Sequence, residues 1–220
     1  MNANAPPTGF FLSSGGLHMA AKRAFTRARL EDAKPIEKQD AVLTAILFSA
    51  AALEAYINET FQIIRGMPAL WQSSNKVSAF ADVLDEAEEH RASPKLKYLL
   101  AKIVLTGTSF DKGALPYQDF DLLMAMRDEL MHYKLQRIED THKIVERLKS
   151  RKIQIAHEPN VRVSWTSVIA TPDVAKWACN TAASMINTIQ QGLFAAVPAE
   201  SDPSMLHFLA GVHYTPIEER

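Results

Sequence analysis

The sequence predicts an all-α fold, in which a single domain forms a helical bundle of four to five main helices. Long segments carry apolar residues at the spacing that lines one face of a helix. Proline follows Lys34, Ser93 and Thr171, where it suits the first turn of a helix because the missing N–H is unpaired there in any case. Glycine follows two of the apolar segments, a position typical of a helix C-cap. A short irregular or hairpin excursion is predicted before the last helix.

The composition narrows the class of protein. With 220 residues, 47% of them hydrophobic and 22% charged, the chain is ordinary for a globular protein with a sizeable core. A formal net charge of -1 argues against extensive coating of DNA, but it leaves room for a local basic patch. The one cysteine, Cys179, excludes an intrachain disulfide and suits a buried apolar position. We find no apolar run of the roughly 20 residues that a bilayer requires and no signal-peptide pattern, so we expect a cytoplasmic protein without membrane contact.

Three regions are predicted along the chain. Residues 1–16 are small, proline-bearing and glycine-ended, and are expected to form a flexible N-terminal arm. Residues 17–197 hold the apolar periodic segments and form the bundle. Residues 198–220 follow a helix that Pro198 ends, and are expected to form a peripheral C-terminal tail.

The first predicted helix, at about 17–32, is basic. Three of its cations lie within about 120° of one another at the helical spacing of about 100° per residue: Lys22, Arg23 and Arg29. They form either a solvated face or a surface that binds phosphates.

The second predicted helix runs from Pro35 to about Arg65 and ends at Gly66. Its centre is rich in alanine and apolar on most sides, which predicts a buried helix that its neighbours approach closely. Glu54 and Asn58 lie four residues apart on one face of it. They occupy either a buried polar site or a thin exposed stripe.

The remaining helices follow in order. One or two short helices are predicted in 69–90, and another begins after Ser93 and stops near Gly107. A surface loop at 107–116 leads to a central amphipathic helix, which we expect from Tyr117 to Lys134.

The segment after this central helix is basic. Residues 134–152 contain seven positive and three negative side chains, which leaves a local excess of +4. Residues 153–170 are expected to form the strand, hairpin or irregular excursion. The last helix, at about 172–196, begins with the cap Thr171 and a first-turn proline.

Arg127 and His132 stand where the central helix changes from apolar to polar. An arginine holds a phosphate with a fixed fork of donors, and a histidine moves protons near neutral pH, which together suit phosphodiester chemistry on RNA. The spacing alone is weak, because Arg137 and His142 repeat it. An offset of five residues places the two side chains about 140° apart on a helix. This geometry predicts a site that a second helix or a second copy of the chain completes.

Two segments of the chain resemble the signatures of one family. Met126–Lys134 resembles the hallmark of the HEPN superfamily (higher eukaryotes and prokaryotes nucleotide-binding domain), in which an arginine and a polar residue precede a histidine near the end of a bundle helix. Phe48–Asn58 resembles the other signature helix of that superfamily, with an acidic residue and a downstream asparagine. The resemblance covers about a quarter of the chain.

The resemblance implies a metal-independent endoribonuclease of the toxin or defence type, which works as a homodimer with both motifs at the interface. His132 would be the acid or base, Arg127 the phosphate clamp and Asp128 its polar orienting neighbour. Glu54 would be the partner on another helix that fixes Arg127, and Asn58 belongs to the same signature helix. The RNA 2′-hydroxyl would attack its own phosphate and give a 2′,3′-cyclic end, with general acid–base help and no metal or other cofactor.

The two residues that follow the histidine, Tyr133 and Lys134, indicate which kind of antitoxin could be a partner. In the toxin branch whose antitoxin modifies a tyrosine, that tyrosine lies two positions after the histidine. Here Tyr133 follows His132 directly and Lys134 takes the second place. An antitoxin protein remains a candidate partner, but the pattern does not favour one that modifies a tyrosine.

Two alternatives stay open. Many HEPN proteins are non-catalytic, so the chain could be a helical binding or assembly protein on the same bundle, or the matches could be accidental. If the protein is such a binding or assembly protein, Arg127 and His132 should lie far apart, or be locked in structural hydrogen bonds away from any cleft. The sequence has no glycine-rich phosphate loop, zinc-spaced Cys/His set or nucleophile elbow that would favour another chemistry.

Overall fold

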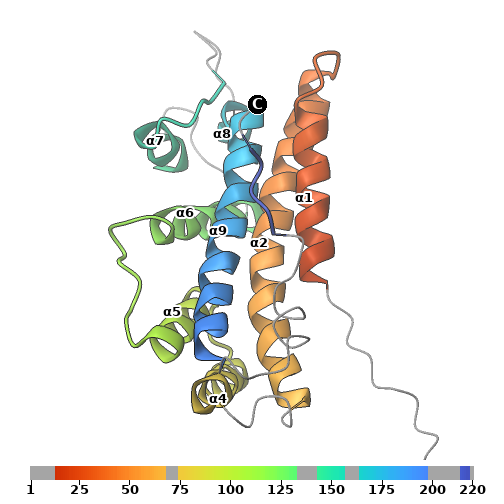
Figure 1. The fold of residues 1–220 in the computed structure, drawn as a ribbon. Coiled ribbons are helices and arrows are strands. Elements are labelled where there is room, and N and C mark those ends of the chain that lie inside the picture. The colour runs from red at the N-terminus through yellow and green to blue at the C-terminus, as the bar shows by residue number, and fades with distance from the viewer. Residues whose placement is uncertain (1–12, 68–73, 133–142, 157–163, 198–213, 219–220) are drawn as a thin grey trace, which may run out of the picture.

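The described part of the protein is entirely helical, which confirms the predicted all-α class. A computed structural model describes residues 13–67, 74–132, 143–156, 164–197 and 214–218. Within these ranges the chain forms eight helices (Figure 1), with the bounds α1 Ser14–Ala28, α2 Pro35–Gly66, α4 Asn75–Glu89, α5 Pro94–Thr106, α6 Tyr117–Met131, α7 Lys143–Ser150, α8 Trp165–Val168 and α9 Pro172–Ala196.

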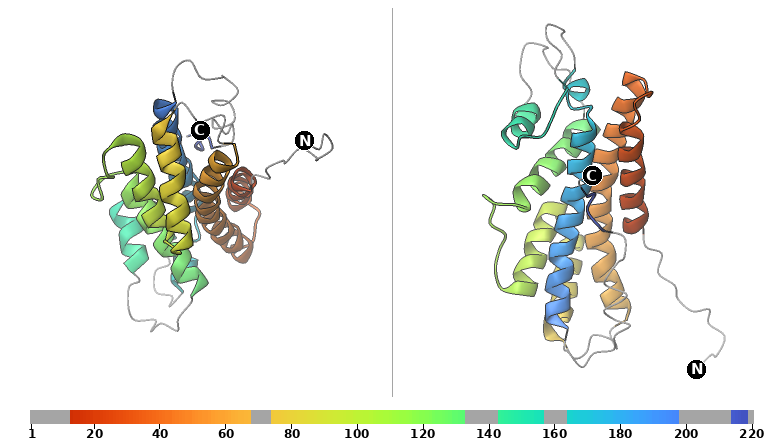
Figure 2. Two further views of the ribbon diagram at one scale, coloured as in Figure 1. Left: turned by 90° about the horizontal axis from the view of Figure 1, so that it is seen from below. Right: turned by 45° about the horizontal axis from the view of Figure 1, so that its top comes forward.

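The long helix α2 is the axis of the bundle. It contacts α1, α4, α5, α6, α8 and α9. Helix α1 covers one side of the pair formed by α2 and α9, and α4, α5 and α6 pack on the other side (Figures 1 and 2). Fully buried small side chains such as Ala45, Ala50 and Ala52 let neighbouring helices approach α2 closely, while Leu53 and Ile57 fill the core between them.

Most helix ends follow the local signals in the sequence. Ser93 and Thr171 accept hydrogen bonds of 3.3 Å from the backbone N–H groups of Leu96 and Val174, as N-cap residues do. Gly107 ends α5 at φ 73°, a conformation that costs glycine little because it has no Cβ.

The first helix differs from its prediction because a distant residue caps it. The Glu59 carboxylate on α2 accepts the backbone N–H groups of Ser13 (2.6 Å) and Ser14 (3.2 Å). A carboxylate satisfies unpaired N–H groups and favours the positive end of the helix dipole. Helix α1 therefore starts at Ser14, inside the stretch expected to belong to the arm. Of the predicted basic face of this helix, Lys22 donates to the Thr215 hydroxyl.

The excursion before α9 is irregular where the structure describes it. Ile153–Ala156 has no regular structure, and α8 is a single helical turn. The Ala156 N–H donates to the Val168 carbonyl at 2.8 Å, which closes the excursion. No strand occurs within the described parts of 153–170.

The prediction that no segment is apolar enough to cross a bilayer is wrong for helix α2. By length and composition alone it would qualify. However, 56% of its most apolar window is buried inside the bundle, as in the core helix of a soluble protein.

The described end of the chain also differs from its prediction. Tyr214–Glu218 lies against α1 and α9 instead of forming a peripheral tail, and the Tyr214 side chain is buried.

His18 on α1 is a fully buried histidine beside this C-terminal segment. Its ring packs against that of Tyr214 with 5.6 Å between the ring centroids. Burial and the nearby Lys22 ammonium lower the pKa of His18 to about 4, although the backbone of Thr215 partly offsets them. His18 is therefore neutral in the folded protein at neutral pH.

We predict that His18 makes the protein less stable in acid. In the unfolded chain its pKa is about 6.5, so below that pH the unfolded state binds a proton that the folded state excludes. The contribution of His18 to the free energy of unfolding should be constant above pH 6.5. It should lower this free energy by up to about 3 kcal/mol as the pH falls to 4.

Chemical denaturation at several pH values between 7 and 4 measures this loss. His18→Phe should flatten the profile, while His90→Gln, which changes an exposed histidine on α4, should leave it unchanged. Equal slopes for the wild type and His18→Phe would rule out this origin of acid sensitivity.

Candidate functional site

The C-terminal end of α6 carries the predicted catalytic pair. Fully buried Phe120, Leu123 and Met126 anchor the helix in the core, so its last turn has a fixed position. The helix ends at Met131, three residues before the predicted end, and His132 is its C-cap with φ -118° and ψ 44°. The neighbouring Tyr133 and Lys134 lie outside the described residues.

Arg127 is fixed by two carboxylates. Its Nη2 pairs with Glu54 Oε2 on α2, and its Nη1 donates to Asp128 Oδ1 at 2.8 Å. The structure thus brings together Glu54 and Arg127, which are 73 residues apart in the sequence. Three of the five guanidinium N–H groups make no hydrogen bond to the residues that the structure describes. The arginine is both held in place and able to donate to a further anion.

His132 lies in solvent one helical turn beyond Asp128. Its backbone N–H still donates to the Asp128 carbonyl at 2.9 Å, so Asp128 contacts Arg127 through its side chain and His132 through its backbone. The imidazole ring is exposed and makes no hydrogen bond or ion pair with any described residue. It is free to exchange protons with a substrate.

Asn58 has a hydrogen-bond partner that was not predicted from the sequence. Its Oδ1 accepts a hydrogen bond of 2.7 Å from the Lys97 ammonium on α5, which also pairs with Glu88 on α4. The Lys97 side chain is only 5% exposed. Burial lowers the pKa of Lys97, whereas the negative charge of Glu54 acts to raise it.

The sequence does contain a signal for Lys97. It lies four and eight residues before Ala101 and Leu105, which are both buried, so helical periodicity places Lys97 on the inner face of α5. A lysine on an apolar helix face needs a partner, and this requirement indicates a polar site there.

The polar cluster as a whole carries a net negative charge. It contains two cations, Lys97 and Arg127, and three carboxylates, Glu54, Glu88 and Asp128. A phosphate that binds to Arg127 therefore needs further positive charge from outside this cluster.

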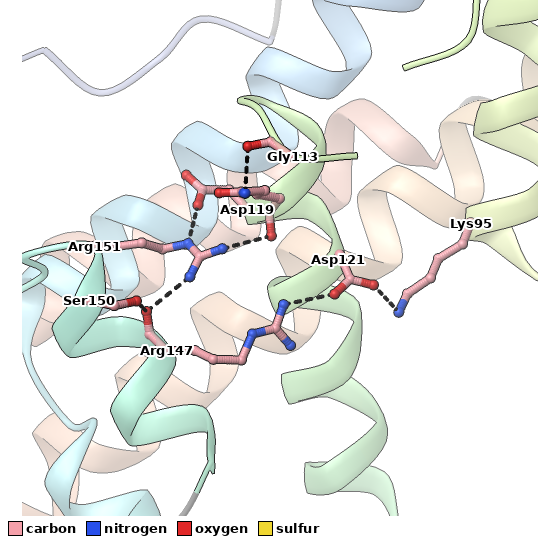
Figure 3. A network of polar contacts seen from close by, with 8 residues as sticks. Lys95, Gly113, Asp119, Asp121, Arg147, Ser150 and Arg151 are labelled. Atoms are coloured by element: carbon pink, nitrogen blue, oxygen red, sulfur yellow. Dashed lines mark hydrogen bonds and ion pairs between the residues drawn. The ribbon is translucent and has the colours of Figure 1, made fainter. Parts of the chain in front are cut away.

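Helix α7 supplies less free positive charge than its sequence suggests. Arg147 donates to Asp121 at 2.7 Å and Arg151 donates to Asp119 at 2.6 Å, which docks α7 antiparallel on α6 (Figure 3). Lys95 shares Asp121 at 2.6 Å. Burial raises the pKa of Asp121, but the hydrogen bonds from Lys95 and Arg147 outweigh burial and hold it below its usual range.

Neither lysine of α7, Lys143 or Lys149, takes part in the described contacts of this network. Lys143 is exposed and lies one turn before Arg147. Because the two helices are antiparallel, Lys143 is at the end of α7 nearer to the C-terminus of α6.

No candidate residue lines a pocket that the described residues form between two other helices. This pocket of about 450 Å³ lies between α4 and α5, and its walls include Val83, Ala87, Leu96 and Leu100. In addition, the described residues contain no group of three His, Cys, Asp or Glu side chains that could hold a metal ion. Arg127 and His132 lie on the surface, where a binding partner could approach both of them.

Comparisons with protein-family models, with curated proteins and with solved structures find no match to this chain. The HEPN resemblance accordingly depends on the two signature segments of the sequence alone.

Proposed function

We propose that the protein is a metal-independent endoribonuclease of the HEPN type, a cytoplasmic toxin or defence enzyme. The contact between Glu54 and Arg127 carries this proposal, because it joins the two signature helices through the residues that the resemblance assigns to a site. This contact holds Arg127 five residues, about one and a half turns, before the exposed His132. Cleavage of an RNA phosphodiester requires an anchored phosphate ligand and a proton carrier, and the last turns of α6 and its C-cap carry one of each.

The chemistry follows from the groups present. The RNA 2′-oxygen bonds to the phosphorus as it loses its proton to a base, and the bond from phosphorus to the 5′-oxygen breaks as that oxygen gains a proton. The products are a 2′,3′-cyclic phosphate and a 5′-hydroxyl. His132 transfers one of these protons, and the free N–H groups of Arg127 stabilise the charge on the phosphorane. DNA resists because it has no 2′-hydroxyl.

A homodimer supplies what one copy lacks. The cluster around Arg127 has a net negative charge, and one histidine provides one of the two proton-transfer groups. A second copy adds another His132 and another Arg127. The adjoining Met131 side chain is 62% exposed, and an exposed apolar side chain next to the site suits a contact between subunits.

A non-catalytic binding or assembly protein is the second candidate function. The pairing of Arg127 with two carboxylates favours it, because such contacts also occur in purely structural networks. In this case the bundle would bind RNA or a protein partner without cleaving it.

We predict that His132→Ala and Arg127→Ala each slow RNA cleavage by about 100-fold or more, the usual contribution of a proton-transfer or charge-stabilising group. His90→Ala, which removes an exposed histidine from α4, is the matched control and should leave the rate unchanged. Cleavage should persist in EDTA and give cyclic phosphate ends, which ³¹P NMR of the products identifies. The enzyme proposal fails if the purified wild type cleaves none of a diverse set of RNAs and expression of wild type and His132→Ala is equally harmless.

We further predict that Glu54→Gln separates binding from chemistry. Removal of this carboxylate lowers the negative charge at the site and loosens Arg127, so RNA should bind more tightly while kcat falls by about tenfold. Glu86→Gln, an exposed charge change on α4, controls for net charge. Steady-state kinetics with RNA-binding titrations measure both quantities. Tighter binding with no cleavage by either protein would favour the non-catalytic function, and an unchanged kcat would show that Glu54 does not position Arg127.

A further inference from the structure

The C-terminal segment Tyr214–Glu218 lies along α1 and α9 as an extended peptide (Figure 1). Tyr214 is its anchor, with a side chain only 7% exposed. The ring packs against His18 of α1 and Tyr56 of α2, with 5.6 Å between ring centroids in both cases. Aromatic anchors of this kind supply most of the apolar contact of a short peptide.

The Tyr214 hydroxyl is part of a hydrogen-bond chain that reaches α2. It donates to Ser14 Oγ at 2.6 Å, and Ser14 Oγ donates to Glu59 Oε2 at 2.5 Å. The anchor pocket therefore recognises the polar end of a tyrosine as well as its ring, and phenylalanine would leave Ser14 without this partner.

Helix α9 recognises the backbone of the segment. Asn180 accepts the N–H of Ile217 at 2.6 Å and donates to its carbonyl at 3.2 Å. Two turns further along the same face, Asn187 donates to the Tyr214 carbonyl at 3.4 Å. Side-chain amides that pair with an extended backbone bind any sequence of suitable shape, because every residue except proline has both groups.

Side chains add the selectivity. Ile217 packs partly buried against the core, three residues after Tyr214. A spacing of three places both on one side of a polyproline-type extended chain, and Pro216 between them favours that conformation. Lys22 donates to the Thr215 hydroxyl at 2.9 Å.

We propose that the groove between α1 and α9 is a recognition site for an extended peptide with the pattern Tyr-x-x-Ile, and that the C-terminal segment of the same chain is its resident and displaceable ligand. The site is independent of the ribonuclease proposal. Tyr56 faces Tyr214, whereas Glu54 faces α6, and residues two apart lie about 200° apart around a helix, so the groove and Arg127 are on opposite sides of α2.

The covalent link between the segment and the bundle explains why a free peptide must compete with the segment for the groove. The segment belongs to the same chain as the groove, so its binding is intramolecular and a free peptide competes against a high effective concentration. A variant whose own segment binds poorly should consequently accept a free peptide that the wild type excludes.

The test uses the full chain and a fluorescein-labelled synthetic peptide with the sequence of residues 212–220. By fluorescence anisotropy, Tyr214→Ala should bind the peptide at least about tenfold more tightly than the wild type does. Addition of Asn180→Ala to that variant should abolish binding, whereas Ser184→Ala, an exposed change on the same helix, should not. A peptide with alanine in place of its tyrosine should not bind.

Three results would overturn the proposal. The first is equal binding of the peptide by the wild type and Tyr214→Ala. The second is no binding by a Tyr214→Ala protein whose circular dichroism spectrum shows intact helices. The third is a wild-type dimer that Asn180→Ala dissociates, because it would show that the segment binds a second copy of the chain. If Tyr214→Ala does not fold, Ile217→Ala with the same peptide decides between the same outcomes. Hydrogen exchange gives a second readout, because Asn180→Ala should expose the Ile217 amide in the otherwise unchanged protein.

Discussion

The structure depends on the burial of α2, on whose central turns three polar side chains each contact a different neighbouring helix. Within six residues, Glu54 pairs with Arg127 of α6, Asn58 accepts from Lys97 of α5, and Glu59 caps the N-terminus of α1. These side chains are partly buried, and their three contacts restrict where the neighbouring helices can sit. Apolar packing holds the bundle together, and these polar contacts fix its geometry.

The same contacts give the candidate site its character. Arg127 is positioned from the core outward, because its partner Glu54 is on the axis helix and the apolar face of α6 is buried beneath it. The partly buried charge pair gains less from attraction than it would in a fully dry interior, but loss of one member leaves the other without its partner. A positioned arginine in the last turns of α6 and an exposed histidine at its C-cap are therefore built into the fold, whichever of the two proposed functions the protein performs.

Local chemistry made much of the fold predictable from the sequence. Capping residues such as Ser93 and Thr171, first-turn prolines and Gly107 determine helix ends within a few residues of chain, and the apolar periodicity predicts the buried faces. The features that escaped prediction depend on residues far away in the sequence. Helix α1 begins early because of Glu59, and the C-terminal segment docks because Asn180 and Tyr214 meet distant partners.

In the candidate site, too, the features set by local sequence were predictable and those set by distant contacts were not. The positions of Arg127, Asp128 and His132 at the end of α6 follow from the sequence, whereas the burial of Lys97 beside Asn58 required the packing of α4 and α5 against α2. The cations of α7 were misjudged for a related reason. Sequence counting cannot show that carboxylates on α6 occupy Arg147 and Arg151.

The most direct test of the central role of α2 is a double-mutant cycle between Glu54 and Arg127. The free energy of unfolding of the wild type, Glu54→Gln, Arg127→Met and the double variant gives the coupling energy of the pair by chemical denaturation. A partly buried ion pair that positions α6 on α2 should show a favourable coupling of about 0.5 to 1.5 kcal/mol. A coupling indistinguishable from zero would contradict the view that this contact joins the two helices.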